Sequence, residues 1–254
     1  EVEGVRPDIK IVNLSLMNAD WYIDNMARRK TYEAAPLPFS FAPAQYRDGT
    51  RDFVFMLEDP NLEGPQDVRS VMRFVADESP RSRIRTGRGM DDYIPTKNFS
   101  LPVDREKVLA NGTVAPEDAD LIVSAVEWTL QDFGLAKNHL MALDFIAENN
   151  WERPVYFAIT TGSDSYMGLD EYFQLEGMAY RLVPIRTRSL DGQPGRINTR
   201  ILYDNVMNKF RWGNMNNSRV YMNEDNRRLA VNFRNVMQRL ADAFIAEGDN
   251  EAAI

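Results

Sequence analysis

The sequence predicts an α/β protein. We expect a layered, mainly parallel sheet with flanking helices over residues 1–197, followed by a helical segment over residues 198–254. Several runs are apolar at consecutive positions, which is typical of strands covered by helices on both faces of a parallel sheet. Between these runs, apolar residues recur at the helical period, and after residue 197 only that period remains. A chain of 254 residues with 44% hydrophobic side chains can bury a substantial core.

Strand and helix patterns alternate in the first half of the chain. Residues 8–16 are apolar at odd and even positions and predict a buried strand. A helix follows over about residues 21–29, with Asn18 or Asp20 available as its cap. Residues 51–57 predict a second strand, and residues 66–78 place apolar side chains on one face of a helix. The turn-rich segment 79–103 favours an extended hairpin.

The second half continues the same alternation. Residues 120–130 predict a strand and residues 136–150 a helix. Residues 153–160 have the clearest pattern of a buried strand, and we expect them to lie in the centre of the sheet with residues 8–14. Residues 168–177 predict a short helix that ends at a glycine, and residues 178–185 predict a further strand.

Beyond residue 197 the pattern predicts two antiparallel helices that pack on or beside the sheet. Residues 199–210 carry apolar side chains at steps of four. The second helix, over residues 223–248, carries one apolar stripe, made of Leu229, Phe233, Val236, Leu240 and Phe244. The sequence then ends on EGDNEAAI, which resembles the turn between two helices of a tetratricopeptide repeat. We therefore expect the chain to be cut at both ends.

Composition argues against several classes of protein. The net charge of −8 argues against a nucleic-acid binder, whose affinity depends on Lys and Arg. Cysteine is absent, so the chain has no disulfide and no thiolate nucleophile. His139 is the only histidine, and we interpret it as an exposed residue in the first turn of a helix. No apolar run approaches the roughly 18 residues that would cross a bilayer.

Motifs that carry chemistry are mostly missing. The sequence contains no phosphate-binding loop, no nucleophile elbow and no zinc-protease motif. Five clustered carboxylates could bind a hard cation, but they lack the spacing of a known calcium loop: Asp91, Asp92, Glu117, Asp118 and Asp120. We interpret them as turn and cap residues, and we predict no metal, no cofactor and no catalytic residue.

Two junctions between predicted elements are candidate binding sites. Ligands of open parallel sheets bind beyond the carboxyl ends of the strands. The predicted binding residues at these ends are Asn13 and Asp20 at the first junction, and Thr160, Thr161 and Asp164 at the second. Because such side chains also cap helices and form turns, the purely structural interpretation remains open. Three tryptophans are either platforms for sugar stacking or buried anchors: Trp128, Trp151 and Trp212.

Several segments resemble one known family. They include VEGVRPDIKIVNLSLMNADWYI, YIPTKNFSLPVD and NNWERPVYFAITTGSDSYMGLDEYFQLEGMAYRLVPI. They look like the extracytoplasmic C-terminal portion of bacterial multi-spanning membrane proteins related to protein O-mannosyltransferases, the transmembrane protein 260-like family. The resemblance covers nearly the whole chain and is most specific over residues 3–22. It implies a preceding membrane-embedded region of the same polypeptide, a periplasmic location as the soluble part of an inner-membrane protein, and continuation into helical repeats.

The resemblance also limits the functional hypotheses. Enzymes of this membrane class carry their catalytic carboxylate between early membrane spans, outside this sequence, so no catalytic residue is transferred to it. The favoured hypothesis is a noncatalytic periplasmic domain of a membrane-embedded glycosyltransferase-like protein, which positions an acceptor protein or glycan. The alternatives are a free-standing sugar- or nucleotide-processing α/β enzyme and a purely structural spacer.

Overall fold

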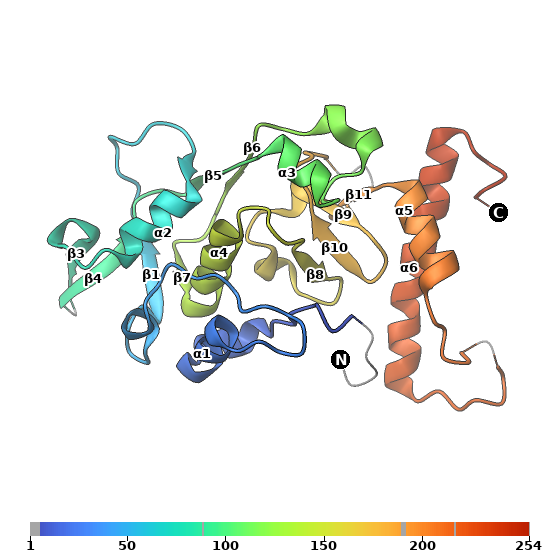
Figure 1. The fold of residues 1–254 in the computed structure, drawn as a ribbon, viewed down its shortest axis with the longest axis horizontal. Helices are drawn as coiled ribbons and strands as arrows, with labels where there is room; N and C mark the ends of the chain where they lie inside the picture. Colours follow the sequence, from blue (N-terminus) through green and yellow to red (C-terminus); the bar gives the residue numbers. More distant parts are fainter. Residues whose placement is uncertain (1–5, 88, 189–191, 216, 254) are drawn as a thin grey trace. The chain divides into compact units, whose positions relative to one another are not determined.

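The structure is a computed structural model that describes residues 6–87, 89–188, 192–215 and 217–253. It contains two compact units (Figure 1). The first unit consists of residues 1–117 and 123–153, and the second of residues 118–122 and 154–254. Both units combine helices with small sheets, which confirms the α/β class. The domain boundary expected between residues 197 and 198 stays a prediction.

The first unit holds two small mixed sheets. The four-stranded sheet has the order β3-β4-β1-β7, in which β4 and β1 are parallel and both outer pairs are antiparallel. The three-stranded sheet has the order β2-β5-β6, with one parallel and one antiparallel pair. The strands are β1 (Phe53–Met56), β2 (Gln66–Asp67), β3 (Arg83–Thr86), β4 (Gly89–Ile94), β5 (Asn98–Pro102), β6 (Ala125–Thr129) and β7 (Gly134–Ala136). The strand predicted at 51–57 and the predicted hairpin are therefore confirmed. The strand predicted at 120–130 is confirmed only over β6, because Pro116–Leu121 forms a 3-10 helix.

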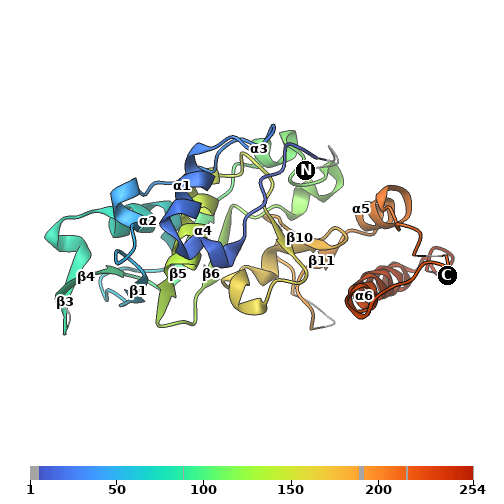
Figure 2. The same cartoon turned by 90° about the horizontal axis from the view of Figure 1, so that it is seen from below.

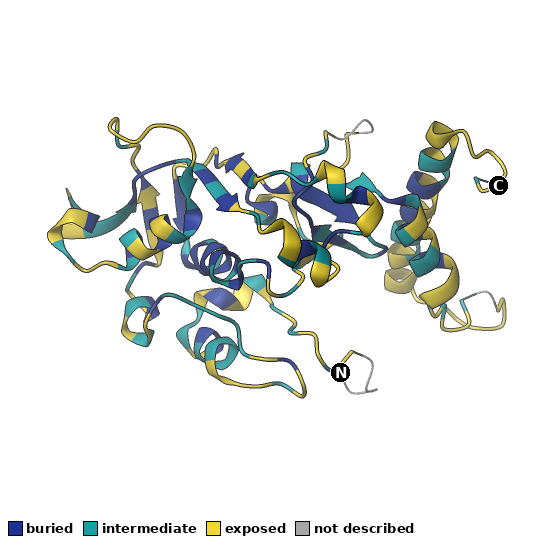
Figure 3. Ribbon diagram, turned by 45° about the horizontal axis from the view of Figure 1, so that its top comes forward, coloured by how far each residue is buried: buried dark blue, intermediate teal, exposed yellow. Residues whose placement is uncertain are grey.

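Helix α4 (Lys137–Asn149) forms the centre of the first unit and is buried along most of its length (Figure 3). Helix α2 (Val68–Ala76) packs against α4 through Val68, Val71, Met72 and Val75. The remaining α-helices of this unit are α1 (Asp20–Arg28) and α3 (Arg105–Ala110). The helices predicted at 21–29, 66–78 and 136–150 are thus confirmed, and α2 buries the apolar face that its periodicity predicted.

The second unit combines a four-stranded mixed sheet with a helical hairpin. The sheet order is β11-β9-β10-β8, with strands β8 (Tyr156–Ala158), β9 (Phe173–Leu175), β10 (Ala179–Leu182) and β11 (Arg196–Ile197). Helix α5 (Thr199–Tyr203) continues into a π-helical turn (Asp204–Lys209), and α6 (Glu224–Glu247) runs back beside it (Figure 2). The Thr199 hydroxyl lies 3.0 Å from a Glu247 carboxylate oxygen, so the start of α5 meets the end of α6. The predicted antiparallel helices are confirmed.

The prediction of a mainly parallel sheet is not confirmed, because all three sheets are mixed. Residues 8–14 form no strand: an extended segment leads into a 3-10 helix at Leu14–Asn18, and Ile11 is 65% exposed. Side chains hold this segment in place of a strand ladder. The Lys10 amine donates to the carbonyl of Arg29, and the Asn13 side chain accepts the Leu16 N–H of the 3-10 helix. An apolar run held in this way needs no neighbouring strand.

The strand predicted at 153–160 exists but is neither central nor long. It is the three-residue edge strand β8, which pairs only with β10 and leaves Tyr156 exposed. The helix predicted at 168–177 is also wrong, because a single 3-10 turn leads into β9, whose three residues are all buried. Phe173 enters an aromatic cluster there and stacks on Tyr180 at 5.6 Å. That packing favours a strand over the local helical pattern.

The predicted apolar stripe of α6 is buried only in part. Val236 and Leu240 are buried, whereas Leu229 is 48% exposed. Phe233 and Phe244 are half-buried, and their rings pack on Trp212 and Tyr203, respectively. The stripe therefore holds α6 against its hairpin partner through its C-terminal half.

Candidate functional site

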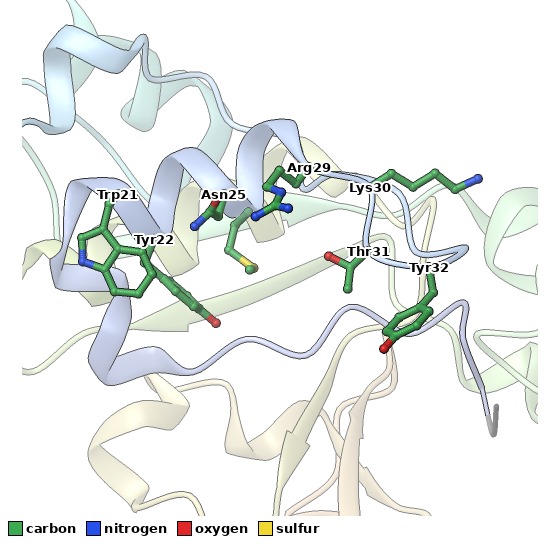
Figure 4. A pocket seen from close by; sticks show the side chains of 8 residues that line it. Trp21, Tyr22, Asn25, Arg29, Lys30, Thr31 and Tyr32 are labelled. Carbon is green, nitrogen blue, oxygen red and sulfur yellow. The ribbon is translucent and has the colours of Figure 1, made fainter. Parts of the chain in front are cut away.

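An open groove of about 450 Å³ runs along α1 and the turn that follows it (Figure 4). Two exposed aromatic rings stand toward its ends, and polar or cationic side chains lie between them. The described lining residues are Trp21, Tyr22, Asn25, Met26, Arg29, Lys30, Thr31 and Tyr32. All of them belong to the first unit. We treat this groove, defined by these eight residues, as the candidate binding groove.

Helix α1 is fixed to the first unit by acidic residues on its inner side. Arg47 pairs with Asp20 at 3.1 Å, and the Tyr46 hydroxyl donates to Asp24 at 2.6 Å. The hydrogen bond from Tyr46 lowers the pKa of Asp24. Burial, together with that same hydrogen bond, raises the pKa of Tyr46 to about 12. These contacts leave the opposite side of α1 free to line the groove.

The N-terminal end of the groove is built from two adjacent aromatic side chains. Tyr22 is buried, and its hydroxyl accepts the backbone N–H of Asn13 at 2.8 Å. The Trp21 ring meets the Tyr22 ring edge-on at a centroid distance of 5.6 Å and is 56% exposed. A rigid, exposed indole supported by a buried ring is a suitable platform for stacking a flat apolar surface.

The far end of the groove is a tight turn with backbone strain. Thr31 and Ala34 exchange two backbone hydrogen bonds, which close a turn around Tyr32 and Glu33. Tyr32 has a φ of +54°, the left-handed region that a residue with a side chain rarely adopts, and its side chain is 58% exposed. A bulky residue held in that region is a pointer to function, because the surrounding structure must hold the strain.

Lysine and arginine side chains give the groove positive charge. The Lys10 amine donates to the Arg29 carbonyl at 2.7 Å and to the Thr31 hydroxyl at 2.9 Å, which caps the C-terminal end of α1. Arg29 and Lys30 are exposed. Figure 4 shows the Arg29 side chain turned back on the same side as Asn25, whereas Lys30 extends away. The groove thus offers an amide, a hydroxyl and a guanidinium between two aromatic rings.

Comparison with known proteins places the chain in one family. A family model described as TMEM260-associated domain 2 matches residues 1–201. The chain belongs to this family. No curated protein and no solved structure gives a significant match. The candidate groove lies wholly inside the matched region, whereas α6 lies outside it. The groove is therefore a feature of the TMEM260-associated domain itself.

Two of the predicted site residues in this TMEM260-associated domain adjoin the groove but have structural roles. The Asn13 side chain caps the 3-10 helix at Leu14–Asn18, and Asp20 forms its ion pair with Arg47. Thr160, Thr161 and Asp164 belong to the second unit, in the turn after β8 and the 3-10 helix that follows. Thr160 and Asp164 are exposed, and the Thr161 N–H donates to the Ala158 carbonyl. Ligand binding at these five residues stays a prediction.

Sequence reasoning did not single out Trp21, Arg29 or Tyr32. The tryptophans considered as stacking platforms are Trp128 and Trp151, which are buried, and Trp212, which is half-buried against aromatic neighbours. One signal for Trp21 was present: it stands between Asp20, at the start of α1, and the buried residues Tyr22 and Ile23. When two adjacent residues of a short helix face the core, the residue before them points to another side, so a large ring there is a candidate for exposure.

Two of the five carboxylates weighed as cation ligands form structural ion pairs. Asp118 binds Arg196, and Asp92 lies 3.2 Å from both Arg51 and Arg83. Within the described ranges, no group of three His, Asp or Glu side chains could hold a metal ion. None of the helices in the part of the chain that the structure describes is both long and apolar enough to cross a membrane.

Proposed function

We propose that this chain is a noncatalytic glycan-binding domain whose binding site is the groove along α1. One observation carries the proposal: exposed Trp21 and exposed Tyr32 stand apart along a groove lined by Asn25, Arg29 and Thr31 between them. A sugar ring has an apolar C–H face and a hydroxyl edge, so it matches an aromatic platform next to hydrogen-bonding side chains.

A glycan fits the groove better than a polypeptide does. Peptides commonly bind by adding a strand to a sheet edge or by laying a helix in an apolar groove. None of the eight described lining residues belongs to a named strand, and Met26 is the only aliphatic side chain among them. At a rise of 1.5 Å per residue, α1 separates positions 21 and 29 by about 12 Å. That length suits an oligosaccharide rather than a single sugar.

The resemblance to transmembrane protein 260-like proteins supports a wider setting for this activity. In that setting the domain lies in the periplasm, as the soluble part of a membrane-embedded glycosyltransferase-like protein. Its partner would be the membrane region of the same polypeptide, and the bound glycan would belong to the acceptor. The domain would then position the acceptor while chemistry takes place elsewhere in the polypeptide.

Titration with oligosaccharides, followed by NMR, tests the proposal. The indole N–H signal of Trp21 and the backbone signals of α1 should shift together. Trp21→Ala should weaken binding roughly five- to tenfold, the loss expected for one stacked ring. Phe133→Ala is the matched control, because Phe133 is an exposed ring of the first unit outside the groove. Shifts confined to other residues, or turnover of a glycoside by the chain alone, would contradict the proposal.

A further inference from the structure

We propose that the glycan bound in the groove is acidic, and that Arg29 binds its carboxylate or phosphate group. This inference rests on the proposed function and adds the chemical class of the ligand. It starts from a contrast of charge: the whole chain carries a net charge of −8, yet none of the eight described lining residues is acidic and two are cationic.

The two acidic residues of α1 are engaged elsewhere, and Glu33, in the turn after the helix, is exposed and is not among the described lining residues. Asp20 pairs with Arg47, and Asp24 is bound by Tyr46, Arg28 and Arg47. Among the residues that the structure describes, no ion pair joins Arg29 or Lys30 to a carboxylate. The one positive side chain at this end of α1 with a nearby acidic partner is Arg28, which lies 3.5 Å from Asp24. Arg29 is therefore a guanidinium that no described carboxylate neutralises.

A simpler role for Arg29 is to complement the helix dipole, since cations favour the C-terminal end of a helix. The structure already assigns that role to Lys10, whose amine donates directly to the carbonyl of Arg29. Arg28 adds a second cation in the last turn. The helix end is thus satisfied without the Arg29 side chain, which instead turns back on the side of the groove that holds Asn25 (Figure 4).

The chemistry of a guanidinium narrows the ligand further. Its planar, fork-shaped set of donors matches a carboxylate or a phosphate through two parallel hydrogen bonds. We expect the acidic group to lie at Arg29 and the apolar face of another sugar to lie on Trp21. Lys30 extends away from the groove and should contribute only through its longer-range field, which salt screens.

A matched pair of ligands tests the inference on the full chain. Calorimetry would compare a neutral oligogalactose with the corresponding oligogalacturonate, and a sugar phosphate in a third arm distinguishes phosphate from carboxylate. The acidic ligand should bind about tenfold more tightly, as one charge-assisted hydrogen-bonded pair provides. Arg29→Gln should remove that advantage by weakening the acidic ligand about tenfold more than the neutral one, and Lys30→Gln should have a smaller effect.

Arg28→Gln is the control, because it removes one positive charge from the same helix without altering the groove lining. It should change the affinity less than twofold. Equal affinity for neutral and acidic ligands would overturn this inference and leave the proposed function intact. Equal losses from Arg28→Gln and Arg29→Gln would also overturn it, because a diffuse field would then explain the preference. Binding of an acidic peptide but of no oligosaccharide would overturn both proposals.

Discussion

The groove of the first unit and the sheet of the second unit use the same kinds of side chain in opposite ways. Across the second sheet, four residues lie side by side in register, one on each strand: Tyr156, Arg181, Gln174 and Arg196. We call these four residues the polar row. Like the groove, the polar row combines guanidinium, amide and aromatic groups.

The difference lies in how many of these groups are paired. Glu176 accepts hydrogen bonds from Tyr156 at 3.0 Å and from Gln174 at 2.8 Å, and it lies 3.4 Å from Arg181. Asp118 holds both terminal nitrogens of Arg196 and also accepts from Asn198. The two guanidiniums of the polar row therefore each have a carboxylate, and both carboxylates are largely buried. The groove contains no such carboxylate.

This contrast separates structural polar groups from groups available to a ligand. Burying a charge is unfavourable unless it is paired, so a paired and buried row indicates a role in stability. An exposed guanidinium beside exposed rings contributes little to stability and can be kept for binding. Substitutions in the polar row should therefore affect folding, whereas substitutions in the groove should affect affinity.

The largest expected effect comes from Asp118→Ala, which removes the carboxylate partner of Arg196 in the polar row. It leaves the Arg196 guanidinium buried without its carboxylate, which should lower the free energy of unfolding by about 3–5 kcal/mol. Urea denaturation of the whole chain measures this change. Glu224→Ala is the control, because it breaks an exposed ion pair with Arg228 on α6 and should change stability by less than about 0.5 kcal/mol. Similar losses from both variants would remove the distinction between buried and exposed ion pairs.

The next effect concerns a buried carboxylate of the first unit. Asp144 on α4 accepts hydrogen bonds from the backbone N–H of Ser40 at 2.8 Å and from the Ser40 hydroxyl at 2.5 Å. Burial raises the pKa of Asp144 to about 6, and nearby Glu148 acts in the same direction. The folded state thus binds a proton more tightly than the unfolded state does. The contribution of this tighter proton binding to the free energy of unfolding is complete below pH 4. It is lost as the pH rises through 6, an effect of about 3 kcal/mol.

Asp144→Asn tests the predicted direction of this change in stability with pH. The amide mimics the protonated acid, because its NH₂ can donate to the Ser40 hydroxyl while its oxygen accepts the Ser40 N–H. Between pH 4 and pH 7, the free energy of unfolding of the variant should therefore fall less than that of the starting protein, by the amount that Asp144 causes. Denaturant unfolding of both proteins at several pH values gives the comparison. Parallel stability curves for the two proteins would show that Asp144 has an ordinary pKa in the folded state.

The longer helices were predictable in this chain because their signal is local. Valine and methionine at the helical period in α2, and the apolar positions of α4, leave one arrangement that buries them. Strand positions depend on distant partners. Residues 153–160 resemble a central strand, yet β8 has one neighbour, and the central strand β9 comes from a segment with a helical pattern. The packing of side chains around Phe173 decides that this segment forms a strand. Those packing partners lie outside the segment itself, so no short sequence window reveals them.

The candidate groove was predictable only at its margin. Asn13 and Asp20 were chosen as residues that follow a strand, and they are next to the groove through the Tyr22 hydroxyl and the start of α1. Trp21 and Arg29 needed the exposed face of α1 to be known. Tyr32 needed its backbone angle, because a left-handed tyrosine has no sequence signature of the kind that glycine provides.

The smallest effect on stability is expected at Tyr32. This residue is the sharpest test of the contrast between the polar row, which serves folding, and the groove, which serves binding. Tyr32→Gly relieves a left-handed backbone strain of about 1–2 kcal/mol but adds freedom to the unfolded chain. The net free energy of unfolding should therefore stay within about 1 kcal/mol of the starting value. Because the exposed ring is lost, affinity for the oligosaccharide should fall several-fold.

Tyr32→Ala separates the ring from the backbone, because it removes the ring and keeps the strain. Both variants should lose affinity equally, while Tyr32→Gly should be the more stable of the two, by up to about 1 kcal/mol. Thermal unfolding and calorimetric titration of the two proteins measure these quantities. Full affinity in Tyr32→Gly would remove the ring from the binding site. A large loss of stability in both variants would place Tyr32 with the polar row, as a residue kept for folding. We expect Tyr32 to be a strained residue whose exposed ring contributes to ligand binding and not to folding.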